Sequence, residues 1–400
     1  MDRTRVPRAL RWTFVAAALL AAVVAPVAAR VARAAPPVAA PAKPASPAPA
    51  KPGAAVEDLS PLLAPIRAKH DVPALCAAFV RHDRVVAIGV DGVRRRGDPT
   101  KATTDDLWHL GSCTKSMTAT LVAKLVEEGA MTWDETLGRF EAGFFPKDAD
   151  AGWKNVTVEE LLTNRSGAPT NLDADGLWGV LWRREGTPVA QRRRLLEGVL
   201  RHPPLSPPGT KFLYSNAGFS IAGELAEVRT KTAYEDLLRA KLFVPLHLDS
   251  AGFGPPGKAG VLDEPRAHTA AGSPVEPGIA ADNPPAIAPA GLVHMTIRDW
   301  ATYVAMHLLG DRGESTFLTL ATFRRLHTPP AGFDYAMGWI AAERPWGGGT
   351  VLTHAGTNTM WYAVTWIAPK RDFAVVITCN QGGDAAAKAC DDVASALVTR

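Results

Sequence analysis

The chain has 400 residues, of which 47% are hydrophobic and 21% are charged, and its formal net charge at pH 7 is +4. This composition is typical of an ordinary globular protein with a sizeable core. The first 35 residues carry six arginines and one aspartate, so the remainder of the chain has a formal charge of −1. That balance excludes the strongly basic surface that nucleic-acid binding requires.

The N-terminal segment has the pattern of an export signal. Several arginines among the first residues precede an apolar run over 12–29, and small residues suited to cleavage follow within 26–35. We therefore expect 1–35 to be a signal peptide and 36–55, rich in alanine and proline, to be a linker. The cleaved protein is then secreted or periplasmic, with no stable membrane insertion. Because the apolar run is long enough to span a bilayer, a retained anchor stays the alternative.

Helix and strand patterns follow one another after the linker. The sequence predicts a helix over 59–69, then strands over 74–80 and 85–91 that are joined by a turn at 82–83. A longer helix is predicted over 112–128, because its apolar residues recur at helical spacing and a glycine follows its end.

Ser112 and Lys115 stand three positions apart at the start of that helix. Residues at this spacing lie roughly 60° apart around the helix axis, so Ser112 Oγ and Lys115 Nζ can meet. A serine hydroxyl becomes nucleophilic when a neighbouring base accepts its proton, and an amine in a partly dry pocket is such a base. Cys113 faces away from the lysine and Ser116 is adjacent to it, so Ser112 is the predicted nucleophile. The alternative is a serine that only caps the helix, with Lys115 exposed.

The helix-rich middle of the chain contains a second candidate motif. Tyr214 and Asn216 follow a Pro-Pro-Gly turn, in a segment predicted to be extended, where residues two apart point the same way. The phenol of Tyr214 can relay a proton, and the amide of Asn216 can hold Lys115 or a substrate carbonyl. The alternative is a structural tyrosine beside a capping asparagine. The helices predicted in this region cover 158–164, 192–200, 218–229 and 233–243.

The C-terminal part of the chain returns to strands. A strand predicted over 350–353 leads into His354 and Gly356. His354 can donate to a substrate carboxylate or carbonyl, or steady Tyr214, and Gly356 lets a ligand approach the backbone closely. The alternative for His354 is a surface residue or a satisfied core residue. The remaining predicted strands cover 338–342, 360–368 and 373–378, and a final helix covers 384–398.

Strands at both ends of the chain, with helices between them, predict an α+β fold whose sheet is built from distant segments. We expect one catalytic domain over 56–400, in which 56–110 and 286–400 form the α/β part and 111–285 forms an inserted helical part. The active site is expected in the groove between the two parts, a usual place for ligands.

Four cysteines remain after the predicted signal peptide, and export permits disulfides among them. Cys76 and Cys379 both have the character of sheet positions, so they are one possible pair. The preferred alternative is that all four cysteines are buried thiols in a core that does not need cross-links. The sequence has no spacing typical of a metal site, so we expect no metal and no cofactor. The four cysteines are Cys76, Cys113, Cys379 and Cys390.

Taken together, the three motifs resemble those of the serine beta-lactamase-related family. That family spans class C beta-lactamases, penicillin-binding D,D-peptidases, D-aminopeptidases and family VIII carboxylesterases. The similarity covers the chain from about Val56 to its end, with flanking matches at 161–167, 246–250, 290–293 and 335–339. The motifs that carry it, in the family's order, are Ser112-x-x-Lys115, Tyr214-x-Asn216 and His354-x-Gly356.

The resemblance implies a beta-lactamase/transpeptidase-like fold with an antiparallel sheet flanked by helices, and two-step acyl transfer at the site. Lys115, helped by Tyr214, would take the proton of Ser112, which then attacks an ester or amide carbonyl. By family position, the oxyanion would lie between the backbone N–H groups of Ser112 and Thr357. Asn216 would position the substrate and Lys115.

One position departs from the family pattern. His354 stands where many members carry a lysine, whose fixed positive charge suits the carboxylate of a beta-lactam or a D-Ala-D-Ala peptide. A histidine is mostly neutral at pH 7, so the expected role of His354 is to polarise or orient. The expected function is therefore hydrolysis of an ester or small amide through an acyl-enzyme on Ser112. The expected partner is a small-molecule ester, amide or peptide substrate, and the protein is expected to be a monomer. The alternatives are a class C-type beta-lactamase or D-Ala-D-Ala carboxypeptidase and, from another class, a non-catalytic penicillin-binding-like envelope sensor.

Overall fold

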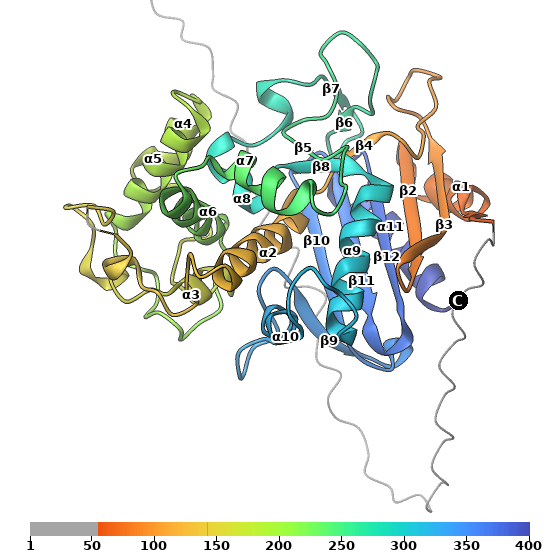
Figure 1. The fold of residues 1–400 in the computed structure, drawn as a ribbon. Helices are drawn as coiled ribbons and strands as arrows, with labels where there is room; N and C mark the ends of the chain where they lie inside the picture. The colour runs from red at the N-terminus through yellow and green to blue at the C-terminus, as the bar shows by residue number, and fades with distance from the viewer. Residues whose placement is uncertain (1–54, 142) are drawn as a thin grey trace, which may run out of the picture. The chain divides into compact units, whose positions relative to one another are not determined.

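The computed structural model describes residues 55–141 and 143–400. Seven strands from this part of the chain form one sheet (Figure 1). In chain order its strands are β1 (Glu57–Asp58), β2 (Ala74–Arg81), β3 (Arg84–Gly92), β9 (Ile340–Arg344), β10 (Gly349–Thr357), β11 (Tyr362–Ala368) and β12 (Phe373–Cys379). Their order across the sheet is β1-β3-β2-β12-β11-β10-β9. Only β1 and β3 pair in parallel; the other neighbouring pairs are antiparallel, as expected.

The expected signal peptide, 1–35, and all but the last residue of the expected linker, 36–55, lie outside the described residues. Within the described part of the chain, no helix combines the length and the apolar character needed to cross a bilayer.

Alternate side chains of the central strands enter two separate cores. On β2, Leu75 and Phe79 belong to one core, whereas Cys76 and Val80 belong to the other. The first core lies under α1 (Ser60–His70) and α11 (Gly383–Val398), and α9 (Ile297–Arg312) packs on the opposite face of the sheet. The sheet is therefore buried between two helical layers, which explains why its strands read as nearly continuous apolar runs (Figure 1).

The sheet register decides the question of the cysteines. Cys76 lies opposite Thr378, and Cys379 lies opposite Leu75 on the same strand pair. Neighbours that are offset by one residue point to opposite faces of a sheet, so the possible Cys76–Cys379 pair was wrong. All four cysteines of the described chain are buried free thiols, the alternative that the sequence favoured.

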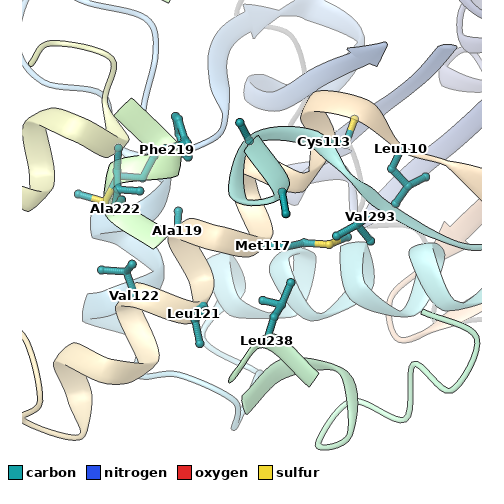
Figure 2. Packing of buried hydrophobic residues seen from close by; sticks show 14 of the residues in the cluster. Leu110, Cys113, Met117, Ala119, Leu121, Val122, Phe219, Ala222, Leu238 and Val293 are labelled. Atoms are coloured by element: carbon teal, nitrogen blue, oxygen red, sulfur yellow. The ribbon is translucent and has the colours of Figure 1, made fainter. Parts of the chain in front are cut away.

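The helix that follows the predicted nucleophile, α2 (Thr114–Glu127), is buried on nearly every side. It packs against α6 (Asn216–Thr230), α7 (Tyr234–Leu238) and α8 (Ala288–Gly291). Figure 2 shows Phe219 and Ala222 of α6 on the side of α2 that carries Ala119 and Val122. This packing fixes α2 between the sheet and the remaining helices. Those helices are α3 (Val158–Leu162), α4 (Leu177–Trp182), α5 (Pro188–Leu200), α6 (Asn216–Thr230), α7 (Tyr234–Leu238), α8 (Ala288–Gly291) and α10 (Leu320–His327).

The stretch 111–285, which was expected to be helical, also contains short strands. β5 (Gly252–Phe253) pairs with β8 (Val293–Thr296), which pairs in turn with β4 (Leu107–His109), and β6 (Ala267–His268) pairs with β7 (Pro274–Val275). Two-residue strands carry too little periodicity to be recognised in a sequence.

Helix α9 was not predicted from the sequence, although its signals are present. Thr296 caps the helix by accepting a hydrogen bond from the Asp299 N–H. Trp300, Val304 and Leu308 are buried at four-residue intervals along one face, which is helical spacing.

Candidate active site

The predicted nucleophile lies in a tight turn that leads into α2. Gly111–Cys113 form a single 3-10 turn, so Ser112 precedes the α-helix instead of opening it. Gly111 has φ +50°, and a Cβ at this position would lie 2.4 Å from the backbone nitrogen of Thr357. Only glycine fits both conditions, and its presence lets the end of β10 lie against the Ser112 turn.

The side chain of Lys115 is fully buried, and its Nζ has three hydrogen-bond partners. Nζ lies 3.1 Å from Ser112 Oγ, 2.7 Å from Asn216 Oδ1 and 2.8 Å from the backbone oxygen of Ala290. The amide and backbone oxygens can only accept hydrogen bonds. In the neutral amine the two N–H groups satisfy these two oxygens, and the nitrogen lone pair is then directed at the Ser112 hydroxyl.

Burial lowers the pKa of Lys115 to about 7. Within the described residues, the hydrogen-bond partners of Nζ include no carboxylate that would hold the proton on. The rings of Tyr214 and Phe219 lie 4.7 Å and 5.6 Å from Nζ, and the attraction of an ammonium to an aromatic face offsets part of the desolvation. Near neutral pH, much of Lys115 is therefore an uncharged amine that can accept a proton.

Tyr214 and Asn216 reach Lys115 from the start of α6. The prediction that both lie in one extended segment was wrong for Asn216, which is the first residue of α6. Ser215 caps that helix by accepting from the Gly218 N–H, and its own N–H donates to Asn164 Oδ1 at 3.0 Å. These bonds fix the backbone between the two site residues, so both side chains face the lysine. Burial raises the pKa of Tyr214, and a hydrogen bond with Ser112 opposes that shift.

His354 lies on β10, close to the site but already hydrogen-bonded. Its Nδ1 donates to the backbone oxygen of Ala355 at 2.6 Å, and its Nε2 lies 3.1 Å from Tyr335 Oη. A backbone oxygen cannot donate, so Nε2 of the neutral ring is the atom that accepts from Tyr335. Burial, together with the nearby charge of Lys115, lowers the pKa of His354 to about 3. The ring is therefore neutral at physiological pH and has no free nitrogen to offer a substrate carboxylate, one of the roles considered for it.

Gly356 and Thr357 bring a second backbone amide to the Ser112 turn. A Cβ on Gly356 would lie 2.0 Å from the backbone oxygen of Leu110 and 2.7 Å from the backbone nitrogen of Ser112. The backbone atoms of Leu110 and Ser112 leave no space for a side chain at position 356, so only glycine can be accommodated there. A Cβ on Gly111 would in turn lie 2.4 Å from the backbone nitrogen of Thr357, so the amides of Ser112 and Thr357 lie on adjoining pieces of backbone, while the Thr357 side chain is exposed.

The two competing side chains near Ser112 are occupied elsewhere. Cys113 is buried, its Sγ lies 3.5 Å from the backbone oxygen of His354, and burial raises the pKa of the thiol. Ser116 is also buried; it donates to the Cys113 carbonyl and accepts from Tyr303 Oη. Neither group hydrogen-bonds to Lys115.

Several residues that complete this geometry were absent from the sequence prediction. The oxygen of Ala290 belongs to the backbone, so no side-chain pattern reveals it. Tyr335 lay within a stretch that matched the family, and its contact with His354 becomes visible only when 335–339 and β10 are folded together. Over residues 55–141 and 143–400, no group of three or more His, Cys, Asp or Glu side chains has the arrangement of a metal site.

The chain matches one known protein family over most of its described length. The model of the family described as Beta-lactamase matches residues 59–399. The chain belongs to this family. Its members are serine hydrolases.

Two curated proteins are similar to this chain over much of its length. The chain is 31% identical over 246 residues to penicillin-binding protein 4 of Amycolatopsis lactamdurans, covering 61% of each chain. It is 27% identical over 304 residues to an unguisins hydrolase of Aspergillus campestris, covering 70% of this chain and 54% of that protein. The chain therefore spans less than two thirds of the length of either relative.

Solved structures of other proteins share the fold. The octameric penicillin-binding protein homologue from Pyrococcus abyssi has a TM-score of 0.69 at 22% identity, covering 86% of this chain and 77% of that chain. A D-stereospecific amidohydrolase from Streptomyces has a TM-score of 0.63 at 22% identity, covering 80% of this chain and 93% of that chain. The chain thus has the beta-lactamase/transpeptidase-like fold that the motifs implied.

Proposed function

We propose that this protein hydrolyses an ester or a small amide through an acyl-enzyme on Ser112. The observation that carries the proposal is the bonding of Lys115 Nζ, which has two acceptor-only partners and Ser112 Oγ as its third. A buried amine with a pKa of about 7 is matched to proton transfer near neutral pH.

The first step forms the acyl-enzyme. Lys115 takes the proton of Ser112 as Oγ attacks the substrate carbonyl, and the carbonyl oxygen becomes an oxyanion between the backbone amides of Ser112 and Thr357. The tetrahedral intermediate then collapses, the bond to the leaving group breaks, and the proton passes from Lys115 through the phenol of Tyr214 to the leaving group.

The second step releases the acyl group. Water attacks the ester on Ser112 while Lys115, with Tyr214, accepts one of its protons. Collapse of the second oxyanion breaks the bond to Oγ, which regains its proton. The products are a carboxylic acid and the free enzyme, and no further reactant is consumed.

The state of His354 favours substrates without a carboxylate at this position. The histidine is neutral, and its ring nitrogens are bonded to Ala355 and Tyr335. A site that lacks a fixed positive charge there gains little from the carboxylate of a beta-lactam or of a D-Ala-D-Ala peptide. We therefore rank a neutral ester or D-amino-acid amide above those substrates, and rank a non-catalytic sensor last because the Ser112, Lys115 and Tyr214 set is complete.

The test compares wild type with Ser112→Ala and with Cys113→Ala as the matched control. We expect wild type and Cys113→Ala to hydrolyse p-nitrophenyl acetate and to gain one fluorophosphonate adduct, mapped by mass spectrometry to Ser112 in the wild type. Ser112→Ala should lose both properties. Normal turnover by Ser112→Ala would disprove the assignment. A panel of ester, D-amino-acid amide, D-Ala-D-Ala peptide and cephalosporin, compared by kcat/KM, then identifies the substrate class.

We further propose that the protein is exported and acts as a monomer. The pattern of residues 1–35 favours secretion or a periplasmic location, and the proposed substrate is a small molecule acted on by a monomer.

A further inference from the structure

Three buried polar side chains form a connected cluster beside the two backbone amides of the proposed oxyanion site. His109, Asp282 and Asn358 are 0%, 1% and 4% exposed, and they come from β4, from the loop before α8, and from the turn between β10 and β11. Asp282 Oδ2 lies 2.8 Å from His109 Nε2, and Asp282 Oδ1 lies 3.1 Å from Asn358 Nδ2. Oδ1 also accepts from the backbone N–H of Asn283 at 2.8 Å. The carboxylate thus links two side chains that are far apart in the sequence.

On one side of Asp282, His109 binds the turn that carries Ser112. The backbone N–H of Gly111 donates to Nδ1 of His109 at 3.1 Å. A backbone amide cannot accept, so Nδ1 carries no proton, and the hydrogen of the neutral ring is on Nε2. Nε2 therefore donates to Asp282. The carboxylate fixes the tautomer of His109 that can receive the Gly111 amide, which directly precedes Ser112.

On the other side of Asp282, Asn358 binds the turn that follows Thr357. Asn358 Oδ1 accepts from the backbone N–H groups of Met360 and Trp361, at 3.2 Å and 3.1 Å. These two donors fix the orientation of the amide, so its NH₂ group faces Asp282. Between Asn358 and Met360 lies Thr359 at φ +76°, a conformation that is unfavourable for a β-branched residue. The bonds of Asn358 stabilise this strained turn and hence the end of β10.

We infer that Asp282 is a positioning residue, acting through His109 and Asn358 to set the spacing between the Ser112 and Thr357 backbone amides. The inference rests on the proposed function, because it assigns these amides to the oxyanion. None of the three side chains is proposed to touch the substrate. The backbone segments that carry the two amides are both linked to this one buried carboxylate, through His109 at Gly111 and through Asn358 after Thr357, so a change at Asp282 displaces the amides relative to each other. A displacement of about 1 Å at a catalytic group can cost about 100-fold in rate.

The decisive variant is Asp282→Asn. The carboxylate accepts from three donors, on His109, Asn283 and Asn358. An asparagine has one oxygen and one NH₂ group in place of the two carboxylate oxygens. The NH₂ group therefore faces either His109 or the pair of donors on Asn283 and Asn358, and in both orientations at least one donor loses its acceptor. We expect kcat for p-nitrophenyl acetate to fall about 10- to 100-fold, with KM changed less than about threefold. The affinity for a phenylboronic acid, whose Ser112 adduct places an oxygen between the two amides, should fall by a similar factor.

Rates are normalised to the fraction of protein that a fluorophosphonate labels at Ser112, which removes the contribution of misfolded molecules. The matched control is Asp299→Asn, because the Asp299 carboxylate likewise accepts from a backbone N–H and a side chain, both of Ser250, and these are not site residues. We expect this control to lower Tm without changing the normalised kcat or the boronate affinity.

A second variant, Asn358→Ala, removes only the bonds between Asp282 and the turn that follows Thr357. It keeps the test decisive if Asp282→Asn does not fold. We expect its normalised kcat and its boronate affinity to fall together, by about tenfold. If both variants kept wild-type kcat and boronate affinity, the positioning role would be disproved while the serine hydrolase assignment stood. If the wild type were neither labelled nor active, the proposed function would fail and this inference with it.

Discussion

Lys115 Nζ lies 2.7 Å from Oδ1 of Asn216, a contact that joins the buried amine to an uncharged acceptor. An amide oxygen accepts a hydrogen bond from the amine and from the ammonium alike, but it contributes no full charge to favour the ammonium. The side chain at position 216 therefore helps to set the pH range in which Lys115 can act as a base.

Replacing this amide with a carboxylate changes that range. In Asn216→Asp a negative charge stands beside Lys115, which stabilises the ammonium and raises the lysine pKa above about 7 by roughly 1–3 units. A base must be deprotonated to act, so the rise of kcat/KM with pH should move to higher pH by the same amount. The profile of kcat/KM for p-nitrophenyl acetate between pH 5 and pH 10 measures this shift. An unchanged midpoint would mean that a group other than Lys115 governs the acid side of the profile.

Gly356→Ala tests the contact between β10 and the Ser112 turn. The added methyl group would lie 2.0 Å from the Leu110 backbone oxygen and 2.7 Å from the Ser112 backbone nitrogen. Backbone atoms cannot rotate away as side chains do, so the strand and the turn must separate. We expect kcat/KM to fall about 100-fold or more, because the two backbone amides move apart.

Gly179→Ala is the control for that substitution. Gly179 lies in α4, and a Cβ there meets no atom within 4 Å. Alanine is favoured over glycine in a helix by about 1 kcal/mol, so this variant should keep full activity and an equal or higher Tm. Equal activity of the Gly356→Ala variant and wild type would contradict the proposed arrangement of the amides.

Periodicity and motif spacing were sufficient for the framework of the molecule. The strands over 74–80 and 85–91 and the helix over 59–69 match β2, β3 and α1 within about one residue at each end. These elements are long, strongly patterned and local, so their residues alone specify them.

Contacts between distant segments were not predictable in the same way. His354 was identified as a site residue, but its bond to Tyr335 arises only when β10 and the segment 335–339 pack together. Asp282 and Asn358 stand 76 positions apart and carry no recognisable spacing. The sequence shows which side chains can do chemistry, whereas the tertiary packing decides which of their atoms remain free to do it.

Several buried histidines predict a loss of stability in acid. Burial lowers the pKa of His354 to about 3, and those of His268 and His294 to about 4. In the unfolded chain each of them titrates near 6.5, so between about pH 6.5 and pH 4 the unfolded state binds protons that the folded state does not. The free energy of unfolding should therefore fall as pH falls, by up to about 1.4 kcal/mol per pH unit for each residue.

Urea unfolding at several pH values between 7 and 5 measures this slope. His294→Gln should reduce the slope, because it removes one of the groups that take up a proton on unfolding. His247→Gln is the control, since that side chain is exposed and should leave the slope unchanged. An equal slope in wild type and His294→Gln would refute the assignment of the proton uptake.

Tyr214→Phe separates the two proposed tasks of the proton relay. The phenol is proposed to deliver a proton to the leaving group, and p-nitrophenolate departs readily without one, whereas an alkoxide or an amide anion does not. The substitution should therefore lower kcat for an alkyl ester or amide by about 10²- to 10⁴-fold, the usual contribution of general acid catalysis, and lower kcat for p-nitrophenyl acetate much less. Both rates are measured on the same preparation, with active sites counted by fluorophosphonate labelling of Ser112. Equal losses on the two substrates would show that Tyr214 supports Lys115 or the fold and does not protonate the leaving group.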